Sequence, residues 1–396
     1  MTSRPVIRLR PKIDPRPLKR GFPWVYANQL VTDRRTRSIA PGSIVTLEDA
    51  ERNPLATATL NPNSKIIARV LDTAPTATID RDWLRIKVTQ ALALREAFYD
   101  TPHYRLIHAE ADGLPGTVVD RFGDALVIQP NAAWIDTLLP EFADVLREVT
   151  GAATLYKNAQ GRARSLEGLD DVSNLLSGTL DGPVPVPMNG ATYMADLEGG
   201  QKTGLFYDQR PNHAFVARLS RGLDVLDVFS HVGGFALAAL AQGANSALSV
   251  DGSDPALSLA RAGAEASGVA DRFETLKSDA FDALSALGED GRSFGSVICD
   301  PPAFAPSKSA RDAGLRAYEK VARLAAPLVA PGGFLTLCSC SQAADLAAFQ
   351  SASERGIGKA GRQAQVLRTG FAGPDHPRLP ALAESGYLKA LTFRLA

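Results

Sequence analysis

The chain has 396 residues and balances 43 lysines and arginines against 43 aspartates and glutamates, which excludes a polycation or a polyanion. A hydrophobic content of 45% supplies enough apolar side chains for the cores of two or three domains. Three cysteines, an odd number, do not make a disulfide framework, and no apolar run approaches the ~20 residues of a membrane span. These features favour a cytoplasmic protein with no membrane partner.

The first 75 residues combine a strand-rich pattern with an uneven charge. Strand-like segments at 6–10, 43–48, 55–60 and 66–71 are separated by Pro, Gly and Asn. Residues 1–40 carry ten lysines and arginines against two aspartates. This excess is either a solvated face or a surface for RNA phosphates. The aromatic cluster at 22–26 is either core or a stacking surface for RNA bases.

Residues 76–190 read as a linker helix followed by a mixed α+β domain. Apolar residues recur at spacings of three and four over 80–99, and Asp80 is a plausible N-cap. Strand patterns follow at 104–109, 116–121 and 125–130. A helix is expected at 134–149, and short strands at 154–156 and 184–186.

From residue 191 onward, strands alternate with helices. Strands are expected at 225–228, 247–250, 273–276, 297–299 and 334–338, and helices at 234–241, 255–267, 308–328 and 343–355. Two last strands, 366–369 and 387–393, have no helix between them, which suggests an antiparallel edge hairpin. Repeated strand–helix units predict an α/β fold with a Rossmann-like, largely parallel sheet over 191–396.

A glycine turn and four acids mark the carboxyl edge of this sheet, where ligands bind in open α/β folds. The first strand ends in Asp227, and Gly233-Gly234 opens the next helix. Asp251, Asp279 and Asp300 follow later strands. Asp251 is placed to bind ribose hydroxyls and Asp279 to reach an adenine amino group, although each acid alone is better explained as an exposed strand end or a cap. The missing dinucleotide fingerprint and the terminal hairpin favour S-adenosylmethionine over NAD.

Asp300 and Cys340 are the candidate catalytic pair. Asp300-Pro301-Pro302 ends an apolar strand, because proline cannot continue it, and Cys340 follows the next strand. An acid and a thiol at one sheet edge suggest covalent chemistry on an electrophilic ring. A buried structural cysteine remains the alternative for Cys340. Cys338 and Cys299 are expected in the core, and no metal site is expected because the cysteines lack partner histidines.

A further segment, Lys202 to Arg210, precedes the first sheet strand and concentrates polar and aromatic side chains. It either lines the site or forms a loop leading into a helix, with Asp208 as the cap. His213 and His231 have no evident partners and are not expected to be catalytic.

With these motifs, the chain resembles the PUA-domain class I methyltransferases that act on cytosine C5 of large-subunit ribosomal RNA, over nearly its whole length. The matching segments are 18–30 with Pro23-Trp24-Val25, 105–123 with Asp112-Gly113-Leu114-Pro115-Gly116, 202–210, Phe229-Ser230 with Gly233-Gly234-Phe235-Ala236, Asp300-Pro301-Pro302 with Phe304, Ser339-Cys340-Ser341, Asp375-His376-Pro377 and Tyr387-Leu388-Lys389.

The resemblance implies domains at 1–75 (PUA-like, RNA-binding), 76–190 (linker helix and central α+β domain) and 191–396 (methyltransferase). It implies Cys340 as nucleophile and Asp300 as its catalytic partner. The partner would be large-subunit ribosomal RNA or a ribosome assembly intermediate, and a homo-oligomer stays open. The residues expected to bind S-adenosylmethionine are Phe206, Asp208, Gln209, Asp227, Phe229, Ser230, Gly233, Gly234, Phe235, Asp251, Asp279, Asp300 and Pro301.

The sequence also departs from the family pattern. His231-Val232 stands where Tyr-Thr is usual, Ala303 stands where Lys is common, and no cysteine follows Asp300-Pro301. A related group with the same Asp-Pro-Pro-x-Phe motif methylates guanine N7. Two alternatives are therefore kept: RNA N-methylation, at guanine N7 or an exocyclic amine, with a structural Cys340, and a non-catalytic RNA-binding module.

Overall fold

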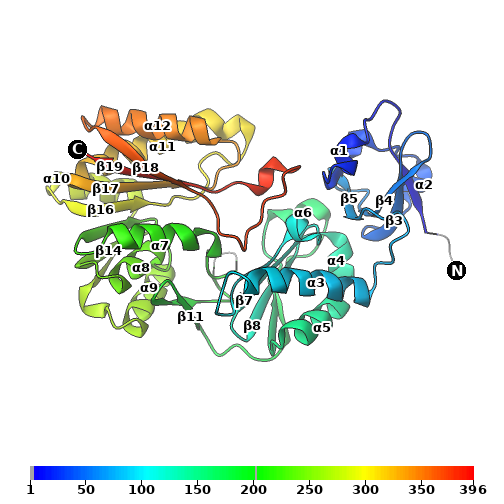
Figure 1. Cartoon of the computed structure of the whole chain (residues 1–396), viewed down its shortest axis with the longest axis horizontal. Helices are drawn as coiled ribbons and strands as arrows, with labels where there is room; N and C mark the ends of the chain where they lie inside the picture. The colour runs from blue at the N-terminus through cyan, green and yellow to red at the C-terminus, as the bar shows by residue number, and fades with distance from the viewer. Residues whose placement is uncertain (1–3, 201–202) are drawn as a thin grey trace. The chain divides into compact units, whose positions relative to one another are not determined.

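A computed structural model describes residues 4–200 and 203–396, which form two compact units (Figure 1). The first contains the chain up to Asp181 together with Thr203 and Pro374–Ser385. The second contains Gly182–Gly200, Gly204–Gly373 and Gly386–Ala396. The chain thus passes between the units several times. The domain boundaries expected at 75/76 and 190/191 remain predictions.

The amino-terminal part of the first unit is a five-stranded sheet in the order β1-β3-β4-β5-β2. Its strands are β1 (Val6–Arg8), β2 (Trp24–Tyr26), β3 (Ser43–Glu48), β4 (Pro54–Leu60) and β5 (Ile66–Asp72), with short helices α1 (Arg16–Lys19) and α2 (Arg34–Arg37). The sequence did not reveal β2, because three residues are too few to show a period. Val25 is buried in the core, whereas Trp24 and Tyr26 are only half-buried, with ring centroids 6.4 Å apart.

The central part of this unit is a second sheet in the order β10-β9-β8-β7-β6. Its strands are β6 (His103–His108), β7 (Thr117–Phe122), β8 (Ala125–Pro130), β9 (Thr154–Lys157) and β10 (Asn174–Ser177), and its helices are α3 (Arg81–Glu96), α4 (Ala133–Thr137), α5 (Leu139–Thr150) and α6 (Arg162–Glu167). The Asp80 cap is confirmed, since its Oδ1 accepts the Trp83 N–H at 2.9 Å. The single helix expected at 134–149 is wrong. Pro140 lacks the N–H that would bond to the Asp136 carbonyl, and the segment divides into α4 and α5.

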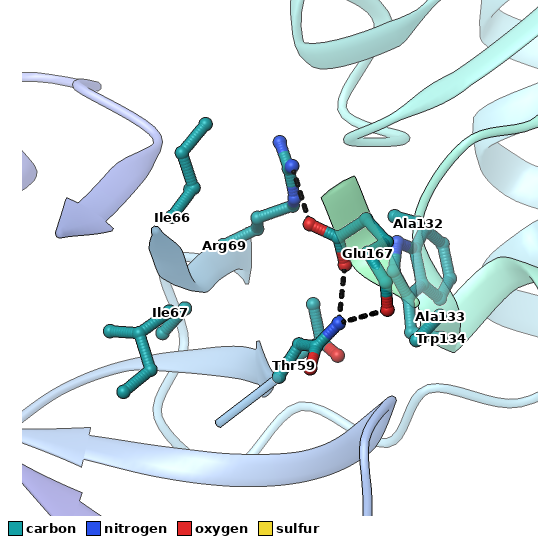
Figure 2. A pocket seen from close by; sticks show the side chains of 10 residues that line it. Thr59, Ile66, Ile67, Arg69, Ala132, Ala133, Trp134 and Glu167 are labelled. Atoms are coloured by element: carbon teal, nitrogen blue, oxygen red, sulfur yellow. Dashed lines mark hydrogen bonds and ion pairs between the residues drawn. The ribbon is translucent and has the colours of Figure 1, made fainter. Parts of the chain in front are cut away.

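A buried carboxylate, Glu167 at the end of α6, joins the two sheets of the first unit (Figure 2). It accepts hydrogen bonds from Asn61 Nδ2 and Ser64 Oγ, each at 2.8 Å, and pairs with Arg69 at 3.0 Å. Arg69 also pairs with Glu110 at 3.1 Å. Because these groups are paired and little exposed, removing one partner would leave an uncompensated buried charge.

The second unit is built on a seven-stranded sheet in the order β15-β14-β13-β16-β17-β19-β18. The strands are β13 (Asp224–Val228), β14 (Ser246–Asp251), β15 (Phe273–Lys277), β16 (Phe294–Cys299), β17 (Val329–Ser339), β18 (Ala364–Gly370) and β19 (Lys389–Leu395). The first five run parallel, and β19 is antiparallel to both β17 and β18. The expected antiparallel pair at the end of the chain is therefore confirmed.

Helices cover both faces of this sheet, with α7 (Arg210–Leu219), α8 (Gly234–Ala241) and α9 (Asp254–Ala266) on one face and α10 (Ala280–Glu289), α11 (Arg311–Ala325) and α12 (Leu346–Lys359) on the other (Figure 1). A separate hairpin, β11 (Val184–Met188) with β12 (Ala191–Ala195), precedes them. The sequence pattern missed α10 and β12. The expected α/β fold with a Rossmann-like, largely parallel sheet is confirmed.

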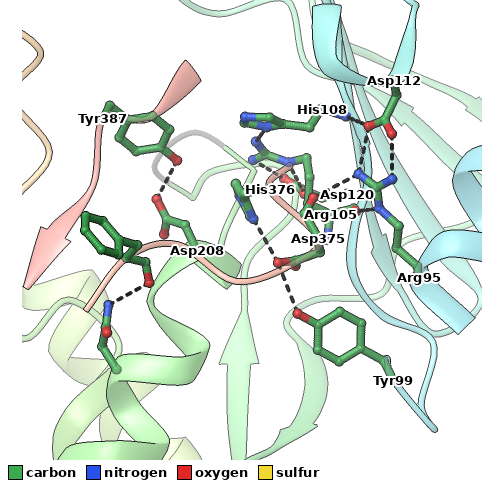
Figure 3. Close-up of polar contacts among 12 residues, drawn as sticks. Arg95, Tyr99, Arg105, His108, Asp112, Asp120, Asp208, Asp375, His376 and Tyr387 are labelled. Carbon is green, nitrogen blue, oxygen red and sulfur yellow. Dashed lines mark hydrogen bonds and ion pairs between the residues drawn. The ribbon is translucent and has the colours of Figure 1, made fainter. Parts of the chain in front are cut away.

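The connection between β18 and β19 spans residues 371–388, and its middle part, 374–385, belongs to the first unit. There, Asp375 is fully buried and accepts hydrogen bonds from the Tyr99 hydroxyl and the Arg105 N–H, and Arg95 donates to its carbonyl (Figure 3). Burial alone would raise the pKa of Asp375, but His376 and the Arg105 N–H hold it below its usual range.

Neither a membrane-spanning segment nor a metal cluster is found within 4–200 and 203–396. No helix there is long and apolar enough to cross a bilayer, and no three His, Cys, Asp or Glu side chains are grouped to hold a metal ion.

Candidate active site

The glycine turn after β13 is a strained loop. Phe229 and His231 have φ values of 62° and 50°, which non-glycine residues rarely adopt, and Gly233 has φ of 79°. At Gly234 an added Cβ would lie 2.8 Å from ring atoms of His213, so only glycine fits there. Such strain persists only where the surroundings enforce it, and it is typical of ligand-binding loops.

Asp227, at the end of β13, lies beneath this loop and is 1% exposed. Its Oδ2 accepts the Ala236 N–H at 3.0 Å, near the start of α8. Burial raises its pKa to about 7, and the neighbouring Asp300 and Asp251 act in the same direction. Its Oδ1 and the buried hydroxyl of Ser230 have no hydrogen-bond partner among the described residues.

Asp251, at the end of β14, is half-buried and anchors the same loop. One carboxylate oxygen accepts the His231 N–H and the other accepts the Ser253 N–H, both at 2.8 Å. Each oxygen keeps a second lone pair, so the carboxylate can still accept bonds from a diol. Asp279, in contrast, is exposed and caps α10 by accepting the N–H groups of Phe281 and Asp282.

The segment before α7 reaches the same sheet edge. Asp208 is buried and does not cap the helix. Instead its Oδ2 accepts the Tyr387 hydroxyl at 2.6 Å (Figure 3), while its Oδ1 lacks a partner among the described residues. Gln209 donates to Asp300 Oδ2 at 2.9 Å. The Phe206 ring lies 4.9 Å from the His231 ring. Lys202, near the start of this segment, lies outside the described residues.

Asp300 and Cys340 follow the adjacent parallel strands β16 and β17, in which Cys299 is paired with Leu337. Cys340 is half-buried, whereas Cys299 and Cys338 are at most 1% exposed, as expected. Burial raises the pKa of both core thiols, which keeps them protonated and unreactive. Cys340 is thus the accessible thiol among the three.

A buried hydroxyl network fixes Cys340 from both sides. Ser339 donates to the Tyr318 hydroxyl at 2.9 Å, and Ser341 bonds with the same hydroxyl at 2.8 Å. Ser341 Oγ also accepts the N–H of Ala305 at 2.9 Å, in the loop that follows Asp300-Pro301-Pro302. The network therefore ties the loop of the acid to the turn of the thiol. Ser339 and Ser341 were recognisable from the motif around Cys340, whereas Tyr318, on α11, was not predicted to belong to the site.

The residues of this edge fit S-adenosylmethionine. The cofactor carries a ribose diol, an adenine ring, and an amino-acid end with a charged amine. Asp251 suits the diol, the unpartnered oxygens of Asp208, Asp227 and Ser230 suit polar groups of the amino-acid end, and Gly233 permits close backbone approach. Of the predicted binding residues, Gln209 is hydrogen-bonded to Asp300, Phe206 lies against the His231 ring, and Asp251 is hydrogen-bonded to the glycine loop. Pro301 is buried beside Asp300, whereas Asp279 caps α10.

Comparison with known proteins supports the same assignment. Residues 7–73 match the PUA-like domain family, and residues 137–394 match the family described as S-adenosylmethionine-dependent methyltransferase. The second match covers more than half of the chain. The chain belongs to the S-adenosylmethionine-dependent methyltransferases.

Relatives of this methyltransferase extend over its whole length. The "Ribosomal RNA large subunit methyltransferase I" of Cronobacter sakazakii is 32% identical over 94% of this chain and 95% of the relative. The "Ribosomal RNA large subunit methyltransferase" of Deinococcus radiodurans is 34% identical over 100% of this chain and 98% of the relative. The predicted family, a PUA-like domain joined to a class I methyltransferase, is therefore confirmed.

Solved structures show the same fold for the methyltransferase. A protein from Streptococcus mutans described as a SAM-dependent methyltransferase aligns with a TM-score of 0.82 and 21% identity, covering 98% of this chain and 100% of that one. A second structure, a methyltransferase complexed with S-adenosylhomocysteine, aligns with the same TM-score and identity. The predictions of an enzyme, of its cofactor and of its fold class are confirmed, and the alternative of a non-catalytic binding module is set aside.

Proposed function

We propose that this enzyme methylates C5 of a cytosine in large-subunit ribosomal RNA, or in a ribosome assembly intermediate, through a covalent bond between Cys340 and C6 of the base. The observation that carries the proposal is the half-buried Cys340 beside Asp300 on neighbouring strand ends, held by a shared hydroxyl network. The names of the full-length relatives support ribosomal RNA as the substrate. We expect the enzyme to act in the cytoplasm, where ribosomal RNA would be available to it.

The chemistry requires a nucleophile because cytosine C5 carries too little electron density to attack a methyl group. Addition of the Cys340 sulfur to C6 moves the C5–C6 π electrons to C5, which then becomes the attacking carbon. S-Adenosylmethionine supplies the methyl group as an electrophilic sulfonium. Loss of the C5 proton to a base and departure of the Cys340 thiolate restore the aromatic ring.

In this proposal Asp300 hydrogen-bonds the edge of the base and stabilises the adduct. Gln209 donates to Asp300 Oδ2 and so fixes the orientation of the carboxylate. The target nucleotide must be unstacked to reach a sheet edge of this kind. The basic amino-terminal residues, among them the exposed Arg34, Arg35 and Arg37 of α2, would contact RNA phosphates.

Trapping on 5-fluorocytosine RNA tests the proposal. Fluorine cannot leave C5 as a proton does, so the wild-type enzyme should form a stable adduct that peptide mass spectrometry maps to Cys340. Cys340→Ala should give neither adduct nor methylated product. Cys338→Ala is the matched control: it removes a buried thiol, costs about 1 kcal/mol of stability and leaves turnover largely intact.

The product distinguishes the remaining alternative. Nucleoside mass spectrometry should find 5-methylcytidine in RNA treated with the wild-type enzyme. An N-methylated nucleoside, or methylation that persists in Cys340→Ala, would refute the covalent C5 mechanism and leave RNA N-methylation with a structural cysteine.

A further inference from the structure

Lys389, the first residue of β19, is a buried cation attached to the turn that carries Cys340. It lies opposite Ser339 in the antiparallel pairing of β19 with β17 and is 5% exposed. Its ammonium donates to the carbonyl oxygen of Ser341 at 2.6 Å and to that of Ala344 at 2.9 Å. Since Cys340 directly precedes Ser341, the position of the thiol depends on where this ammonium group is held.

The positive charge of Lys389 interacts electrostatically with the Cys340 thiol. Burial lowers the pKa of Lys389, and Cys340 and Asp345 act in the opposite direction, since an anion at either position favours the ammonium. Asp345 is exposed, pairs with Arg311 at 3.6 Å and caps α12. Tyr318 also interacts electrostatically with Cys340, but burial raises its pKa, so it stays neutral at physiological pH.

A buried ammonium is costly unless it is compensated. Two backbone carbonyls satisfy two of the three N–H donors of Lys389, but a carbonyl carries no formal charge. A methionine or leucine would fill the same space on β19 without that desolvation cost. Packing alone therefore does not explain why this position carries a charged side chain.

We propose that Lys389 is a positioning residue for Cys340, whose ammonium group holds the 340–344 turn and stabilises the thiolate form of the nucleophile. The inference rests on the proposed function, in which Cys340 attacks the base. The thiol proton leaves to solvent before attack, and Lys389 keeps its own proton throughout. The sulfur lone pair forms the bond to C6, and the same pair returns to sulfur when that bond breaks.

The test is the pH dependence of Cys340 alkylation by iodoacetamide, measured on the full chain without RNA or cofactor and resolved by peptide mass spectrometry. The midpoint of the wild-type enzyme is the reference against which the variants are compared. Lys389→Gln keeps hydrogen-bond donors for the two carbonyls but removes the charge, and Lys389→Met removes both. Lys359→Gln, an exposed lysine of the same unit that pairs with Glu319, is the matched control.

The charge role predicts that Lys389→Gln and Lys389→Met both raise the midpoint by about one pH unit or more, so that alkylation at a fixed lower pH slows about tenfold. Lys359→Gln should leave it unchanged. A wild-type midpoint retained by Lys389→Gln would overturn the inference and leave Lys389 a structural residue. Loss of methylation in Cys340→Ala is measured separately, so failure of this inference is distinct from failure of the proposed function.

Discussion

Ser341→Ala probes the network that joins the acid loop to the thiol turn. Ser341 is fully buried, and its hydroxyl accepts the N–H of Ala305 and bonds with Tyr318. The substitution leaves the buried Ala305 N–H without an acceptor, which costs about 1–3 kcal/mol, and removes the bond with Tyr318, worth about 0.5–1.5 kcal/mol. We therefore expect the second unit to lose about 1.5–4.5 kcal/mol of stability.

The two units can be followed separately in one urea titration. The three tryptophans, Trp24, Trp83 and Trp134, all lie in the first unit, so their fluorescence reports that unit, whereas circular dichroism reports both. With a slope of about 2 kcal/mol/M, the loss corresponds to a midpoint for the second unit that is lower by about 1–2 M. The fluorescence midpoint should not change.

Ser285→Ala is the control for this measurement, because its half-buried hydroxyl bonds only to the Phe281 carbonyl one helical turn earlier. Its effect should stay within about 0.5 kcal/mol. Methyl transfer should slow in Ser341→Ala, since the turn of Cys340 is no longer tied to the loop after Asp300. If the Ser341→Ala midpoint matches those of the wild type and Ser285→Ala, the network is not what holds the two loops together.

Two further predictions concern the acids of the cofactor edge. Asp251→Ala should lower cofactor affinity in calorimetry at least tenfold, since hydrogen bonds to a carboxylate are worth roughly 1.5–3 kcal/mol each. Asp251→Asn should lose less affinity. Unchanged affinity in Asp251→Ala would show that Asp251 does not bind the ribose. Folding raises the pKa of Asp227 to about 7, from an ordinary value near 3.9. Between about pH 4 and pH 7 the folded protein therefore keeps a proton on Asp227 that the unfolded chain has lost. The free energy of unfolding of the cofactor-free enzyme should accordingly fall as pH rises from about 4 to 7. Asp227→Asn removes this titration, so its urea midpoint relative to wild type should rise between pH 5 and pH 8, and parallel pH profiles would show that Asp227 titrates normally.

Much of the second unit was predictable because its strands are short apolar runs that end at acids or prolines. The α8 helix begins and ends where the sequence pattern placed it, and Asp300 was recognisable because Pro301 must end the strand. Cys338 lies within β17 and is buried, whereas Cys340 follows the end of the strand and is half-buried, as the strand pattern predicted. These are local signals, and a single sequence carries them.

Other features depend on contacts between residues distant in the chain. Asp208 was open to interpretation as a helix cap, but the fold buries it against Tyr387, 179 residues later. Asp279 is an exposed cap, whereas Asp251 anchors the glycine loop, although both follow a strand in the same way. The pairing of Tyr318 with Ser339 and Ser341 depends on how α11 packs against the sheet.

The sequence by itself determined the family, most of the strands and helices of the second unit in their order, and the acid and thiol at adjacent strand ends, because each follows from local period, proline stops and motif spacing. The tertiary structure alone decided which polar groups are buried and with what partners. Burial raises the pKa of Asp227, and the β17–β19 pairing brings the ammonium of Lys389 to the turn of Cys340. Desolvation and charge proximity act through space, so only the folded chain fixes them.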